Sequence, residues 1–93
     1  MGVSMYQMSV LLNTRVLSDL EYKIEITNRR MLALAHSVQA GSHTLIDAFF
    51  IEKELMAKKK EYETELESRK HILEAAQKGV KDEAKKSFTI GVA

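Results

Sequence analysis

Residues 36–47, HSVQAGSHTLID, contain the strongest helix break in this chain. Gly41 is the one glycine between two apolar-periodic segments, and a glycine just past a helix end adopts a positive φ at little cost. Thr44 can cap a second helix through its hydroxyl, with Asp47 three residues further on, as in a capping box with a shorter acid. A helix end so close to a helix start predicts a tight turn at residues 40–43 between antiparallel neighbours.

Both sides of this turn carry apolar residues at the alternating three- and four-residue spacing of a coiled-coil seam. The upstream seam is Val10, Leu17, Leu20, Ile24, Met31, Leu34 and Val38, with Asn13 and Thr27 as polar members. The downstream seam is Leu45, Ala48, Leu55, Tyr62, Leu66, Leu73, Ala76 and Val80, with Glu52, Lys59 and Arg69 as charged members. The pattern predicts an all-α fold, an elongated antiparallel two-helix hairpin.

We expect one domain, residues 1–93, with helix 1 at about 4–39 and helix 2 at about 44–86. A separate short N-terminal helix is an alternative, because Ser18 and Glu21 form a capping box that follows Asn13 and Thr14. Gly79 is the weak point of helix 2, where glycine costs about 1 kcal/mol relative to alanine. Residues 87–93, SFTIGVA, are uncharged and partly β-branched, so we predict an extended or disordered tail whose Phe88 and Ile90 dock on a partner.

Composition narrows the class of protein. The chain has 93 residues, no cysteine and no proline, and a formal net charge of +1. There is no thiolate for a nucleophile or a metal, and no general electrostatic drive toward nucleic acid or membrane. The sequence shows no signal peptide and no apolar run long enough to span a bilayer. We therefore expect a cytoplasmic protein, with leaderless export or incorporation into a virion left open.

A hairpin with such a thin seam buries little apolar surface, so we expect oligomerisation or a protein partner to complete it. Residues 51–86 carry 19 of the 27 charged side chains, and the seam itself is diluted by charge. Apolar side chains off the seam, namely Met5, Met8, Leu12, Val16, Ile46, Phe49, Phe50 and Met56, indicate a second contact surface. The predicted partner interface is Leu17, Leu20, Ile24, Met31, Leu34, Phe49, Phe50, Leu55, Tyr62, Leu66 and Leu73.

Phe49-Phe50-Ile51 has two interpretations. In the first, all three side chains pack inside the turn end of the hairpin. In the second, one side chain faces away and anchors a partner, because three consecutive helical positions span about 200°. Aromatic anchors are typical of interface centres.

No motif for catalysis, cofactor or metal binding is present, so we expect a non-enzymatic subunit, adaptor or chaperone without a cofactor. The three histidines, His36, His43 and His71, lack the further ligands of a zinc site. Two alternative functions remain, and each would use its own set of residues. A nucleic-acid-binding hairpin would use Arg29, Arg30, Lys58, Lys59 and Lys60, although acids follow the lysines at once. A helical-bundle enzyme would use Glu52, Lys59 and Arg69.

The layout, with a glycine-containing turn near the middle of the chain, resembles small secretion-related helical hairpins. These include the family whose turn is Trp-x-Gly and the needle subunits of type III secretion. The turn here is Ala40-Gly41-Ser42, without tryptophan or proline. The resemblance implies a helical hairpin and carries no functional residue over.

Overall fold

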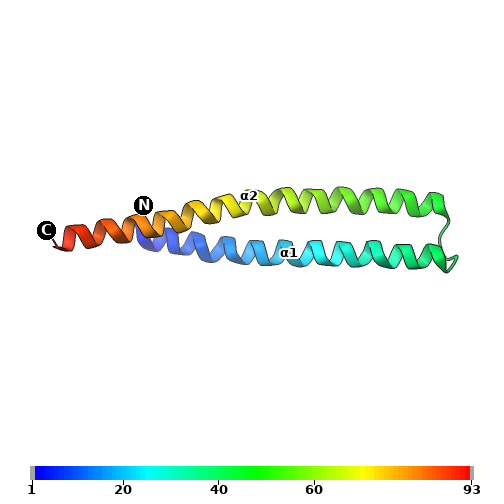
Figure 1. Cartoon of the computed structure of the whole chain (residues 1–93), viewed down its shortest axis with the longest axis horizontal. Coiled ribbons are helices and arrows are strands. Elements are labelled where there is room, and N and C mark those ends of the chain that lie inside the picture. The colour runs from blue at the N-terminus through cyan, green and yellow to red at the C-terminus, as the bar shows by residue number, and fades with distance from the viewer. Residues whose placement is uncertain (1, 93) are drawn as a thin grey trace. The chain divides into compact units, whose positions relative to one another are not determined.

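The computed structural model describes the backbone of residues 2–92 and the side chains of residues 2–86. It contains two α-helices, α1 (Val3–Gln39) and α2 (Leu45–Val92), joined by a short turn, and the described residues form no strand (Figure 1). The predicted all-α helical hairpin is confirmed. Because α1 is one continuous helix, the alternative of a separate N-terminal helix is wrong.

The turn between the helices is a Schellman motif. Gly41 has φ 79°, its N–H donates to the Val38 carbonyl at 3.1 Å, and the Ser42 N–H donates to the Ser37 carbonyl at 2.8 Å. These two bonds satisfy carbonyls that the end of α1 would leave free. The Thr44 hydroxyl then accepts the N–H of Asp47 at 3.2 Å, which caps the start of α2. The predicted roles of Gly41 and Thr44 are confirmed.

The polar residues that suggested a break in helix 1 bond inside the helix instead. Asn13 Nδ2 donates to the Ser9 carbonyl at 2.8 Å, and Thr14 Oγ1 donates to the Val10 carbonyl at 2.7 Å. Both bonds run back to the residue four positions earlier, which is the mid-helix alternative to capping. The helix therefore passes through residues 13–18 without interruption.

Helix α2 continues to Val92, whereas we predicted that it ends near Lys86. The extended or disordered tail at 87–93 is therefore a wrong prediction for the backbone of residues 87–92. An existing helix grows without a new nucleation step, and ordinary residues differ by less than about 1 kcal/mol in helix propensity. The side chains of Phe88 and Ile90, whose docking we predicted, lie outside the described residues, as does Ala93.

The contacts divide the chain into two compact units. Unit 1 comprises residues 1–18 and 67–93, and unit 2 comprises residues 19–66. In each unit a segment of α1 lies antiparallel to a segment of α2 (Figure 1). The single domain over residues 1–93 stays a prediction.

The core of each unit lies on the predicted seam. In unit 1 the buried residues are Asn13, Leu17 and Ala76, and in unit 2 they are Leu20, Thr27 and Ala48. All six belong to the three- and four-residue spacing found in the sequence. Thr27 is accommodated because its hydroxyl donates to the Lys23 carbonyl at 2.8 Å, so no buried polar atom lacks a partner there.

Candidate interaction site

Most of the predicted interface residues lie between the two helices rather than on a free surface. Leu17 and Leu20 are buried. Seven more are half-buried: Ile24, Met31, Leu34, Leu55, Tyr62, Leu66 and Leu73. Only Phe49 and Phe50 are well exposed, at 61% and 63%. These nine residues are thus already engaged within the hairpin, whereas Phe49 and Phe50 remain free.

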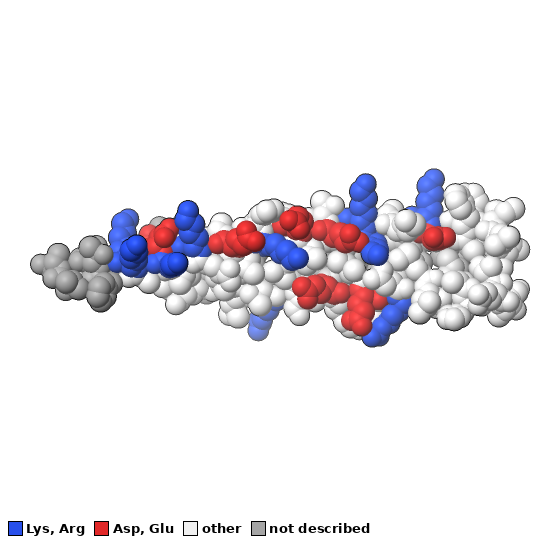
Figure 2. Space-filling model, in the orientation of Figure 1, with Lys and Arg blue, Asp and Glu red and all other residues white. Residues whose placement is uncertain are grey.

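One free apolar surface lies at the start of α2, in unit 2. We call it the tip cluster: Leu45, Ile46, Phe49, Phe50 and Met56, each more than half exposed. The rings of Phe49 and Phe50 meet edge to face, with centroids 5.8 Å apart. On the face shown in Figure 2 the turn end is mostly white, that is, without charged side chains. The interpretation that Phe49, Phe50 and Ile51 all pack inside the turn end is therefore wrong.

A second free apolar surface is a groove between α1 and α2 in unit 1, with a volume of about 580 Å³. Met5, Met8 and Leu12 line it from α1, at 56%, 60% and 53% exposure. Ile72, Ala75 and Ala76 line it from α2. Long side chains on one wall and two alanines on the other leave a hollow that a further helix could fill.

The groove has one charged lining residue, Arg69. Arg69 is half-buried, and its Nη1 donates to Asn13 Oδ1 at 3.4 Å. A guanidinium carries five N–H donors, and a bond of this length is weak. Arg69 therefore keeps donors for a carboxylate that enters the groove.

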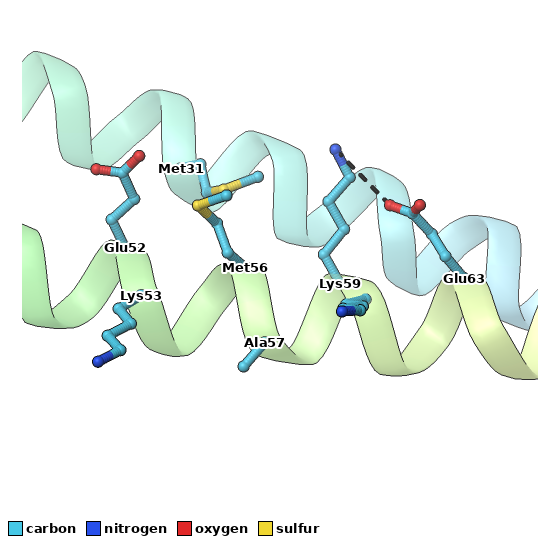
Figure 3. Close-up of a pocket in the computed structure, with 8 residues that line it drawn as sticks. Met31, Glu52, Lys53, Met56, Ala57, Lys59 and Glu63 are labelled. Atoms are coloured by element: carbon cyan, nitrogen blue, oxygen red, sulfur yellow. Dashed lines mark ion pairs between the residues drawn. The ribbon is translucent and has the colours of Figure 1, made fainter.

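Unit 2 has an open cavity of about 570 Å³ between its two helix segments (Figure 3). Met31 of α1 and Met56 of α2 point toward one another there, with Glu52 and Lys59 on either side of them. Lys59 Nζ lies 3.9 Å from Glu63 Oε1. The described residues provide no ion pair or hydrogen bond for Glu52.

The three residues of the rival enzyme hypothesis fall into different units. Glu52 and Lys59 line the cavity of unit 2, and Lys59 pairs with Glu63. Arg69 belongs to unit 1, where it contacts Asn13. Neither unit therefore holds all three side chains.

The basic residues of the rival nucleic-acid hypothesis are interleaved with acids. Arg29 Nη2 lies 2.6 Å from Glu25 Oε1, and Lys59 pairs with Glu63. Figure 2 shows red and blue side chains side by side along α2 rather than an uninterrupted blue stripe. Mixed charge of this kind weakens the field that a phosphate backbone requires.

Lys23 shows the clearest electrostatic perturbation. Its Nζ lies 3.1 Å from Asp19 Oδ2 and 5.9 Å from the centroid of the Tyr62 ring. The hydrogen bond and the charge of Asp19 raise the pKa of Lys23 above its usual 10.5, with smaller contributions from Tyr62 and Glu65. The arrangement links α1 to α2 at the surface of unit 2.

Among the described residues no cluster of histidine and carboxylate side chains could hold a metal ion, and neither helix has a stretch with the length and hydropathy of a membrane span. His71 lies beside Glu67 and Glu74, with nitrogen–oxygen distances of 3.4 and 4.0 Å.

Comparison with protein-family models, curated proteins and solved structures found no match to this chain. No relative therefore suggests a function for the candidate site, and only its geometry supports one. Sequence reasoning found the α1 wall of the groove, through the off-seam spacing of Met5, Met8 and Leu12. It missed the α2 wall, Ile72 and Ala75, because each directly precedes a seam residue and had no period of its own.

Proposed function

We propose that this chain is a non-enzymatic assembly module, a small helical subunit, adaptor or chaperone that acts by helix packing on a protein partner. The main support is that few apolar side chains are buried and many are exposed. Among residues 2–86, whose side chains are described, four hydrophobic residues are buried, Leu17, Leu20, Ala48 and Ala76, while thirteen large hydrophobic side chains are exposed.

The exposed area supports the same proposal. The chain exposes 7260 Å², and folded monomers of its 10.6 kDa mass expose roughly 5,500 Å². A standard protein interface covers about 800 Å² on each partner. The excess is thus large enough for two such interfaces, which fits the two free apolar surfaces.

The grouping of the exposed apolar residues favours specific contacts over chance exposure. Single exposed leucines are common on soluble proteins, but contiguous apolar patches mark interaction sites. Here nine of the thirteen fall into the tip cluster or the groove. The two surfaces also contain flexible methionines, which adapt well to a partner helix.

The test is the mass of the purified chain in solution, measured by sedimentation equilibrium from nanomolar to high micromolar concentration. We expect a mass above that of one chain, and a melting temperature that rises with concentration. A cooperatively folded monomer over the whole range, with no protein bound to it in an extract of its source, would overturn the proposal.

A further inference from the structure

We propose that the tip cluster of one copy docks into the groove of a second copy, with Glu52 of the first copy paired to Arg69 of the second. This inference builds on the proposed function and names the partner as another molecule of this chain. It joins two different surfaces, so each copy can offer one tip cluster and one groove.

Charge complementarity is the reason to expect the tip cluster of a second copy in the groove. Arg69 is the one charged residue that lines the groove, and its bond to Asn13 leaves donors free. The surface that fits must therefore be apolar and carry one carboxylate. The start of α2 does so: Leu45 and Phe49 are exposed, and Glu52 follows them on the same helix face without an ion pair or hydrogen bond among the described residues.

The spacing of the residues fixes one register. On the tip, Phe49 lies three residues before Glu52 and Leu45 seven before it. In the groove, Ile72 lies three residues after Arg69 and Ala76 seven after it. An antiparallel approach therefore places Glu52 on Arg69, Phe49 on Ile72 and Leu45 on Ala76 at the same time.

Size complementarity agrees with this register. Branched tip side chains meet the small residues of the groove: Leu45 and its neighbour Ile46 face Ala76 and Ala75. Met5, Met8 and Leu12 then cover the docked helix from the other wall. A symmetric groove-to-groove dimer would bring two groove arginines into one apolar interface without an acid to neutralise them.

The absence of cysteine from the natural chain gives a direct test. Two single-cysteine variants, Phe49→Cys and Ile72→Cys, are mixed at equal concentration and treated with a short bifunctional maleimide. We expect a covalent dimer in the mixture and little in either variant alone. Phe50→Cys is the matched control, because its side chain points about 100° away from that of Phe49, and it should link to Ile72→Cys several-fold less.

Other cross-linking results would overturn the inference. Efficient linking of Ile72→Cys alone would indicate a groove-to-groove dimer, and linking of Phe49→Cys alone a tip-to-tip dimer. Sedimentation of the same samples without cross-linker distinguishes a failure of this inference from a failure of the proposed assembly function. Oligomers without the Phe49–Ile72 link, or monomers that bind another protein in an extract of their source, would remove this inference and leave the assembly function standing. Monomers without such a partner would remove both.

A charge exchange tests the Glu52–Arg69 pair. We expect Arg69→Glu and Glu52→Arg each to weaken self-association about tenfold, the effect of losing one charge-assisted hydrogen bond. A mixture of the two variants should recover the affinity of the natural chain, because each tip then meets a groove of opposite charge. Failure of the mixture to recover, with both variants helical by circular dichroism, would contradict the pair.

Discussion

The ring of Tyr6 lies against the backbone of Gly79, where α1 and α2 meet in unit 1. A Cβ atom on Gly79 would come within 2.7 Å of Tyr6 Cζ and closer still to two other ring atoms. The glycine that weakens α2 in isolation is thus the residue that admits an aromatic ring between the helices. Both residues are half-buried, so the contact forms part of the packing of this unit.

This contact predicts a reversal of sign in a double-mutant cycle. Gly79→Ala should lower the free energy of unfolding by about 1 kcal/mol, because the ring must move to admit the methyl group. In a Tyr6→Ala background the same substitution should raise it by about 1 kcal/mol, the helix-propensity gain of alanine over glycine. Urea unfolding at a fixed protein concentration measures both. Equal effects in the two backgrounds would exclude a contact between these residues.

The most buried apolar side chain, Leu20 at 2% exposure, should dominate the stability of unit 2. We expect Leu20→Ala to lower the free energy of unfolding by about 2–4 kcal/mol, through lost burial and the cavity left behind. Leu32→Ala is the matched control, since Leu32 lies on the same helix at 62% exposure. Its effect should stay within about 0.5 kcal/mol. Similar losses at both positions would show that the seam is not the core.

The turn requires glycine at position 41 because of its backbone conformation, and not because a side chain would lack space there. Apart from Gly41 itself and its two chain neighbours, no residue comes within 4 Å of a Cβ atom placed there, but φ is +79°. Gly41→Ala should therefore cost about 1 kcal/mol by strain alone, and Gly41→Asn less, because asparagine tolerates this conformation better. Thermal unfolding of the three proteins at one concentration gives the order. Alanine as stable as glycine would contradict the left-handed turn.

Lys23 offers a prediction about pH. Because its folded-state pKa is raised, mainly by Asp19, the interaction stabilises the folded chain below pH 10.5 while Asp19 is ionised. This contribution disappears as the pH rises through the raised pKa. Asp19→Asn should return the pKa of Lys23 toward 10.5, followed by NMR titration of the lysine side chain. Glu21→Gln, on the same helix, is the control and should leave that titration unchanged.

Much of the fold could be read from local sequence. The turn at Gly41, the cap at Thr44 and the three- and four-residue seam all depend on residues within one or two helical turns, and the six buried residues lie on that seam. The end of α2 could not be read this way, because helix propensity is a weak guide at a helix terminus. Only part of the candidate site could be predicted. The sequence identified its exposed apolar residues, but not their grouping into a groove and a tip cluster.

Local sequence specifies two amphipathic helices and the place where the chain reverses. Those features follow from spacing, capping and the conformational freedom of one glycine, which are properties of neighbouring residues. The packing of one helix on the other brings Tyr6 onto Gly79 and Arg69 to Asn13, and it sets which apolar side chains stay exposed. The two contacts join positions more than fifty residues apart. All three facts depend on how far each helix is rotated about its own axis. A periodic pattern indicates the apolar face of a helix but does not fix this rotation to better than about one residue.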